Sequence, residues 1–156
     1  MLENTTRKDL NKTLWVKKDI IESERKWLVI DAKGQTLGKL AVEIANRLIG
    51  KWKSYYNDFW DAGDYVIVEN VTDIVLTGNK KNKKVYYTHS WHKGHLKTIT
   101  FEKMHREKPE EVINLAVRWM LPKNKLRAVR MKRLKVFVGT TDKYNDLSPE
   151  KIEING

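Results

Sequence analysis

Three histidines in the stretch YYTHSWHKGH, residues 86–95, have a type and spacing that could do chemistry. His89, His92 and His95 recur at every third position, and the chain has one further histidine. Imidazole groups can bind a metal, act in acid–base catalysis, or donate hydrogen bonds to phosphate and ribose oxygens. The sequence around them distinguishes among these uses.

The surroundings of the three histidines argue against a metal site. The nearest acidic residues are Asp73 and Glu102, so the carboxylates that usually orient histidine ligands are missing from this stretch. Neighbouring lysines would oppose a dication and would attract a phosphate. We therefore predict that the histidines donate to phosphate or ribose, with Gly94 allowing close approach of the backbone. For any single histidine, an ordinary surface position remains the alternative.

A second candidate is GQTLGKL, residues 34–40, where a glycine turn leads into a helical pattern. A Walker A loop has four residues between its glycines and a Ser or Thr after its Lys. Here three residues separate Gly34 from Gly38, and Leu40 follows Lys39. Two interpretations stay open: a helix start that binds a phosphate of a polyanion beside Lys39, and a plain tight turn.

No catalytic set emerges from the sequence. The chain has no cysteine, which excludes disulfides and thiolate ligands and fits a reducing compartment. Asp61 and Asp64 flank Gly63 before an apolar run, which is more typical of a turn than of a paired acid and base. We predict no enzymatic activity, no metal and no cofactor. A nucleotide-binding enzyme that uses residues 34–39 is the least favoured alternative.

The elements that must position these side chains alternate between strands and helices, which favours an α/β fold with parallel pairing. Short apolar runs predict strands at residues 26–32, 64–70, 72–78 and 134–139. Seven apolar residues at helical spacing between Leu37 and Ile49 predict a helix that stops at Gly50. Residues 83–91 read as a strand or an extended arm near the surface.

A second helix is predicted over residues 100–122, with Pro109 suited to a first turn. The length of 156 residues fits one domain. We place this domain at residues 26–140, between an N-terminal extension at 1–25 and a polar tail at 141–156.

Positive charge is the unusual feature of the composition. The chain has 31 Lys and Arg against 20 Asp and Glu, a net charge of +11. Residues 79–97 hold six lysines and residues 121–139 hold seven basic residues, and neither window contains an acid. Tyr86, Tyr87 and Trp91 lie within the first window and could stack on bases or sugars. The windows predict a polyanion partner, with a solvated lysine-rich surface as the alternative.

The same sequence argues against a membrane and against export. No apolar run approaches the roughly 20 residues that span a bilayer. The first 27 residues mix seven basic with five acidic residues and lack the apolar core of a secretory signal. A mitochondrial transit peptide is poor in acids, so we expect a bacterial cytoplasmic protein. A mature mitochondrial chain could look similar.

Several stretches together resemble one family. KWLVIDAKGQTLGKLAVEIANRLIGK, DAGDYVIVEN, IVLTGNK, KVYYTHS, GHLK, MLPKNKLR and RLKVFVG occur in the order and spacing of ribosomal protein L13, the universal uL13 family. The resemblance covers roughly residues 26–139. It implies a three-layer α/β/α fold around a mainly parallel four-stranded sheet, with basic loops packed into large-subunit ribosomal RNA (rRNA) of the 23S type.

The family further implies a structural role, early participation in subunit assembly, and neighbouring large-subunit proteins as partners. We expect no small-molecule substrate and no homo-oligomer. A free RNA-binding regulator or chaperone on the same fold is the main alternative. The charge windows and the family motifs together predict these RNA-binding residues: Lys39, Lys51, Lys53, Lys80, Lys81, Lys83, Lys84, His89, His92, Lys93, His95, Lys97, Lys123, Lys125, Arg127, Arg130, Lys132 and Arg133.

The chain departs from the family pattern at several of these places. KWKSYYNDFW stands where members commonly carry a further histidine and proline. His92 and His95 stand where members usually have a Gly-Gly arm. WMLPKNKLRA replaces flexible glycines with Trp119, Lys125 and Ala128, which adds charge and removes backbone freedom.

Overall fold

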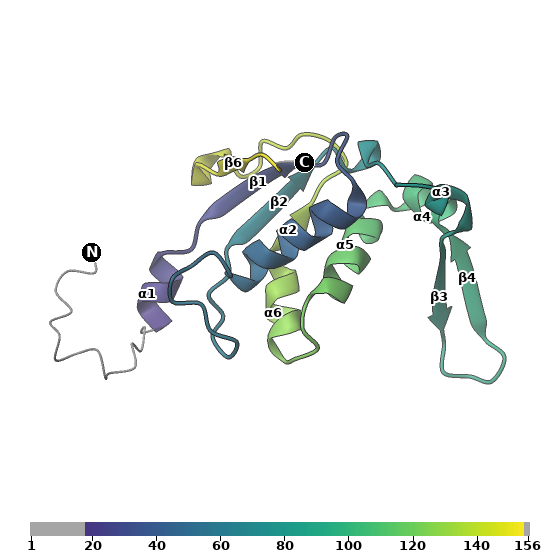
Figure 1. The fold of residues 1–156 in the computed structure, drawn as a ribbon, viewed down its shortest axis with the longest axis horizontal. Helices are drawn as coiled ribbons and strands as arrows, with labels where there is room; N and C mark the ends of the chain where they lie inside the picture. The colour runs from purple at the N-terminus through teal and green to yellow at the C-terminus, as the bar shows by residue number, and fades with distance from the viewer. Residues whose placement is uncertain (1–17, 155–156) are drawn as a thin grey trace, which may run out of the picture.

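The computed structural model describes residues 18–154 of the chain. Its main body is a four-stranded sheet in the order β5-β2-β1-β6, and every pairing in this sheet is parallel. The strands are β1 (Trp27–Asp31), β2 (Tyr65–Glu69), β5 (Leu134–Val136) and β6 (Glu150–Ile152). The predicted α/β fold around a mainly parallel four-stranded sheet is confirmed (Figure 1).

The two central strands are apolar at consecutive positions because both faces of the sheet are covered. The register places Ile30 of β1 opposite Val68 of β2, and both side chains are fully buried in the main core. Val29 lies opposite Ile67, and these two point to the other face.

One face of the sheet is covered by α2 (Leu37–Ile49), α5 (Pro109–Met120) and α6 (Leu126–Lys132) (Figure 1). Helix α2 has the predicted extent, and Gly50 ends it in the left-handed conformation with φ 85°. The Gly50 amide donates to the carbonyl oxygen of Asn46, which satisfies one of the last free carbonyls of the helix. The apolar face of α2 packs on the sheet through seven buried residues: Leu37, Leu40, Ala41, Ile44, Ala45, Leu48 and Ile49.

The opposite face is covered by the C-terminal segment. Trp27 stacks on Tyr65 of the neighbouring strand with ring centroids 4.2 Å apart, and Tyr144 stacks on Trp27 at 5.1 Å. The short 3-10 helix η3 (Asn145–Leu147) follows Tyr144 and leads toward β6. The fold is therefore three-layered, α/β/α. The layer formed by the C-terminal segment is much thinner than the layer of α2, α5 and α6.

Both terminal segments contribute regular structure among the described residues. The predicted polar tail, 141–156, supplies an edge strand, because β6 pairs with β1 and places Lys151 opposite Val29. The predicted N-terminal extension, 1–25, lies mostly outside the described residues. Its described part includes α1 (Lys18–Ser23), which buries Ile21.

A two-stranded unit projects from the main body at the end opposite α1 (Figure 1). Strands β3 (Val85–His89) and β4 (Leu96–Thr100) form an antiparallel hairpin between two short helices, α3 (Lys80–Lys83) and α4 (Phe101–Glu107). Phe101 and Met104 of α4 are buried in the main core and anchor the base of the hairpin.

Two predicted elements are wrong. The apolar run at 72–78 is not a strand: the 3-10 helix η2 (Val71–Asp73) leads into it, and Val75 forms an isolated bridge with Thr36. The helix expected over 100–122 is divided into α4 and α5. Lys108 has φ −145°, and Pro109 has no amide with which to continue the hydrogen bonds of α4.

The end of α2 touches the segment before β2 backbone to backbone at Gly63. A Cβ atom built on Gly63 would lie 1.8 Å from the Leu48 carbonyl oxygen and 3.0 Å from the Arg133 guanidinium. A Cβ on Gly50 would come within 2.8 Å of Ala62 in the same region. Glycine is therefore required at Gly63 for packing.

Replacing Gly63 with Ala should lower the free energy of unfolding by about 2 kcal/mol or more, because the backbone must shift to admit the methyl group. Urea denaturation measures the change. Gly38→Ala is the matched control, since nothing lies within 4 Å of its added Cβ. The packing argument is wrong if both variants unfold at the wild-type urea concentration.

Candidate nucleic-acid interface

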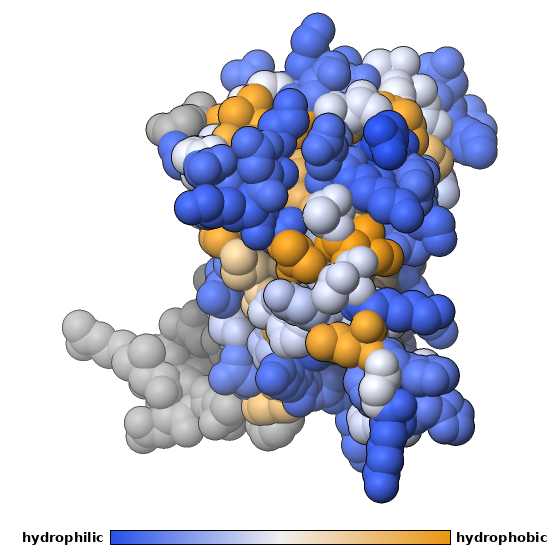
Figure 2. Space-filling view, turned by 90° about the vertical axis from the view of Figure 1, so that its right-hand side faces the viewer, coloured by the Kyte–Doolittle hydropathy of each residue, from blue (hydrophilic) through white to orange (hydrophobic). Residues whose placement is uncertain are grey.

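The projecting hairpin, residues 85–100, exposes both of its faces. Apart from three half-buried side chains at its base, Val85, Tyr86 and Ile99, its residues are exposed. Figure 2 views this end of the molecule: hydrophilic side chains cover most of the visible surface, with apolar patches between them. A two-stranded hairpin is marginally stable in water, so a partner that covers it would stabilise it.

The tip of the hairpin is shaped by local hydrogen bonds. The Trp91 amide donates to Nδ1 of His89 over 2.9 Å. Trp91 has a positive φ, 66°, and is 95% exposed. Because Nδ1 accepts, the neutral ring carries its proton on Nε2, which can donate outward. Gly94 also has a positive φ, 76°. The tip thus presents an indole and a donor nitrogen to any partner.

The other predicted residues of this end are placed with them. His92 and His95 lie with ring centroids 5.9 Å apart. Within residues 18–154, no group of three or more His, Asp or Glu side chains is arranged to hold a metal ion. The structure brings these predicted RNA-binding residues to the hairpin and the helix at its base, all exposed: Lys80, Lys81, Lys83, His89, His92, Lys93, His95 and Lys97.

A groove of about 480 Å³ lies at the base of the hairpin and is called the basal groove here. Lys39 reaches it from the first turn of α2, and Lys80 and Lys84 reach it from α3 and the residue after it. Trp119, near the end of α5, forms another part of its wall. The basal groove therefore gathers three predicted cations from two distant parts of the sequence.

The environment of Lys84 in the basal groove disfavours the charged form of its amine. Partial burial lowers the pKa of Lys84 below its ordinary value, and the positive charge of Lys80 lowers it further. Both effects oppose the charged form of the amine. A bound anion would remove this opposition, so the groove favours negative charge.

Several backbone amides of the turn at residues 34–39 donate hydrogen bonds within the protein. Gly34 donates to the Asp73 carbonyl over 3.0 Å, and Leu37 donates to the Val75 carbonyl over 3.1 Å. Phosphate-binding loops keep such amides free for the ligand. The amides of Gly34 and Leu37 are therefore not free for a phosphate, and the turn contributes the exposed Lys39 to the surface.

Arg130 and Arg133 require a correction, because the structure buries them. Their side chains are 1% and 5% exposed, and both face the carboxylate of Asp61. Both terminal guanidinium nitrogens of Arg133 donate to that carboxylate, and Nη2 also donates to the Leu48 carbonyl over 3.2 Å. These two arginines form ion pairs inside the fold and are not accessible to RNA in this conformation.

Asp61 also binds Arg25, whose guanidinium donates to the Asp61 backbone carbonyl over 2.9 Å. Burial alone would raise the pKa of Asp61, but the hydrogen bond and charge of Arg133 and the charges of Arg25 and Arg130 outweigh it. The pKa of Asp61 is consequently lowered, and its ionised form is favoured by folding. We call Asp61, Arg25, Arg130 and Arg133 the Asp61 cluster.

Lys53 also forms an ion pair inside the fold. Its ammonium group donates to Oδ1 of Asp64 over 2.6 Å, and the side chain is 14% exposed. The same oxygen accepts from the Lys26 amide. The carboxylates of Asp61 and Asp64 are therefore structural, whereas Lys51 nearby is exposed.

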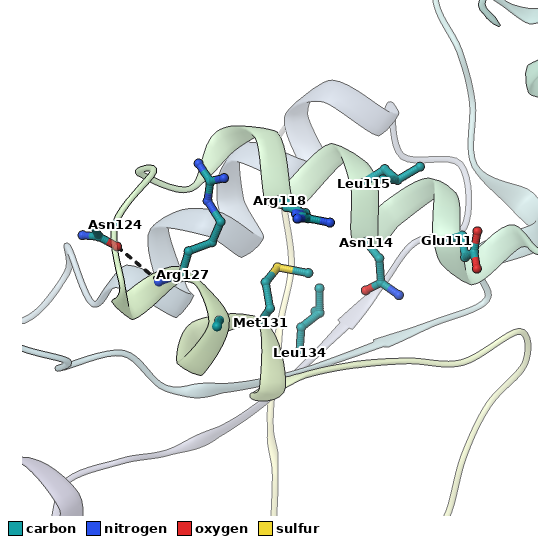
Figure 3. A pocket seen from close by; sticks show the side chains of 9 residues that line it. Glu111, Asn114, Leu115, Arg118, Asn124, Arg127, Met131 and Leu134 are labelled. Atoms are coloured by element: carbon teal, nitrogen blue, oxygen red, sulfur yellow. Dashed lines mark hydrogen bonds between the residues drawn. The ribbon is translucent and has the colours of Figure 1, made fainter. Parts of the chain in front are cut away.

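The second charge window forms a surface around α6. Figure 3 shows a concave region between α5 and α6, with Met131 and Leu134 among the side chains that line it. Arg127 lies on its border, and its guanidinium donates to the Leu121 carbonyl over 2.8 Å. Three other predicted cations of this window are exposed: Lys123, Lys125 and Lys132.

Two residues of these surfaces were not predicted from sequence. Arg118 lines the concave region beside α6, and Trp119 lines the basal groove. Both are exposed, although Val112 and Val117 of the same helix are fully buried. The helical period could have found Arg118, which it places on the solvent side, but it places Trp119 two turns after the buried Val112 and so gave no signal that the indole is exposed.

The fold and these surfaces define a basic α/β domain with exposed cations and two carboxylates, Asp61 and Asp64, that are paired inside the fold. The chain belongs to the ribosomal protein L13 family, whose model matches residues 25–143. It is similar to large ribosomal subunit protein uL13 of Vibrio atlanticus, with 49% identity over 131 residues, 84% of this chain and 92% of the relative. The uL13 protein of Brevibacillus brevis is 47% identical over 136 residues, 87% of this chain and 94% of the relative.

This family consists of structural proteins and not of enzymes, which confirms the non-enzyme prediction. The predicted resemblance is confirmed as well. Among residues 18–154, no helix has the length and apolar character needed to cross a membrane.

Replacing Asp61 with Asn should lower the free energy of unfolding by about 3 kcal/mol at pH 7, because three partly or fully buried guanidinium groups lose their counter-charge. Because folding lowers the pKa of Asp61 from 3.8, its stabilisation is present above pH 3.8 and lost as the pH falls through the folded value. Urea denaturation at several pH values should show that the difference in the free energy of unfolding between wild type and variant becomes smaller below pH 3.8.

Asp146→Asn is the control, since Asp146 is exposed. If Asp61→Asn unfolds like this control at pH 7, the Asp61 cluster does not stabilise the fold.

Proposed function

We propose that the chain is a structural constituent of the large ribosomal subunit, where it binds and organises 23S-type rRNA. Family membership and the names of the relatives support the ribosomal role. Exposed lysines neutralise phosphates, and contacts from separate surfaces fix rRNA segments relative to one another. The protein contributes to early subunit assembly and touches neighbouring large-subunit proteins. The bacterial relatives favour a cytoplasmic ribosome, with a mitochondrial ribosome as the alternative.

The observation that carries this proposal is the cation-rich, exposed hairpin. Lys93 and Lys97 lie on or beside its tip, and no acid occurs between residues 79 and 97 to neutralise them. Like charges on a marginal hairpin repel one another unless a polyanion lies between them. RNA supplies phosphates for the lysines and bases or sugars for the exposed Trp91 and Tyr87.

Binding to a large-subunit rRNA fragment should weaken steeply with salt, because neutralised phosphates release counterions. Exchanging Lys123 and Lys125 for Gln should make the plot of log association constant against log salt concentration less steep, by about 1.5 in slope. Filter binding between low and moderate salt measures this slope.

The matched control is the double exchange of Lys143 and Lys151 for Gln, two exposed lysines of the C-terminal segment. It should leave the slope unchanged. A flat salt response of the wild-type protein would contradict phosphate neutralisation altogether.

The full chain should sediment with large subunits in a sucrose gradient and should already be present in early assembly particles. If the chain sediments only as free protein or as a complex with free RNA, the proposal is wrong and the alternative of a free RNA-binding regulator or chaperone is favoured. Quantitative mass spectrometry of gradient fractions provides the measurement.

A further inference from the structure

The basal groove combines an apolar floor with an exposed indole. Leu37 and Ala41 of α2 line it together with Leu76 of the loop between η2 and α3. Trp119 is 72% exposed although it lies beside these apolar side chains. A large aromatic surface next to an apolar depression is suited to a flat, stackable ligand.

The rim of the basal groove carries charge of one sign. Lys39, Lys80 and Lys84 are its ionisable lining residues, and no carboxylate lines it. Within residues 18–154, none of these three ammonium groups forms an ion pair. A fourth cation is near, since Nζ of Lys123 lies 5.7 Å from the Trp119 ring centroid. The groove therefore complements a ligand that is planar and anionic at once.

A nucleotide has both properties, and an acidic peptide has only one of them. Lysines would bind a peptide carboxylate, but the indole and the apolar floor would then lack a flat partner. Stacking of a base on an aromatic side chain contributes roughly 1–3 kcal/mol and accepts any base. Bases inside a double helix are already stacked, so the nucleotide must come from a loop, a bulge or a strand end.

We propose that the basal groove binds one unstacked nucleotide of the rRNA. The base stacks on the Trp119 indole, and the adjoining phosphates lie against Lys39, Lys80 and Lys84. This inference rests on the rRNA-binding role proposed above and adds a defined contact to it. Because Lys80 and Lys84 also lie at the base of the hairpin, the nucleotide would continue the RNA path along the hairpin.

Replacing Trp119 with Leu tests the stacking contact. Affinity for a large-subunit rRNA fragment should fall about tenfold, while the salt slope stays that of the wild type, because no charge is removed. Trp119→Phe should recover most of the affinity, since a phenyl ring also stacks. Lys80→Gln should instead reduce the salt slope by about 0.8, and Lys151→Gln should change neither quantity.

The outcomes of this test are distinct. Wild-type affinity of Trp119→Leu overturns the groove inference but leaves rRNA binding intact. Equal loss in Trp119→Leu and Trp119→Phe overturns stacking. If the wild-type protein itself does not bind rRNA, the proposed function fails first. Thermal unfolding of each variant separates loss of contact from loss of fold.

Ultraviolet cross-linking of assembled large subunits locates the contact directly. Mass spectrometry should find a nucleotide adduct on the peptide that carries Trp119 or on the peptide that carries Lys80 and Lys84, joined to an unpaired rRNA position. A carbodiimide cross-link from these lysines to a carboxylate of another protein would show an acidic protein partner instead and would overturn the inference.

Discussion

One carboxylate, Asp61, neutralises charge at the point where three separate parts of the chain meet. Arg25 precedes β1, while Arg130 and Arg133 come from α6 and its end. Three cations on one anion leave the cluster with a positive excess, and burial makes each unpaired charge costly. The cluster therefore fixes the junction of α6 and β5 against the segment that leads into β2.

This internal pairing divides the basic residues into two populations. Arg130, Arg133 and Lys53 are held by Asp61 and Asp64 inside the fold. The exposed lysines of the hairpin, the basal groove and the loop before α6 have no such partners among the residues that the structure describes. The first population gives the domain a fixed shape, and the second presents charge at defined places on it. An extended polyanion can then contact several of those places together, which adds affinity without any single strong site.

Sequence reasoning found the parts of the fold with a strong local signal. The period of α2 and the stop at Gly50 gave its extent, and two apolar runs gave β1 and β2. The run at 72–78 misled because its apolar residues form a connection and not a strand: Ile74 and Leu76 are half-buried, Val75 is 46% exposed, and Val75 forms an isolated bridge to Thr36. The edge strand β6 was missed because a three-residue polar strand carries almost no pattern. Residue type gave Arg130 and Arg133 as RNA contacts, but their partner lies about 70 positions earlier in the chain, and spacing alone cannot reveal such a pair. The basal groove, likewise, is created by contacts between distant segments.

A cryo-electron microscopy reconstruction of large subunits that contain this chain tests the central claim most directly. The account predicts rRNA phosphates within hydrogen-bond distance of the hairpin lysines, and the Asp61 cluster intact inside the main body. A map in which the hairpin faces bulk solvent or another protein, with no RNA in reach of those lysines, would contradict it.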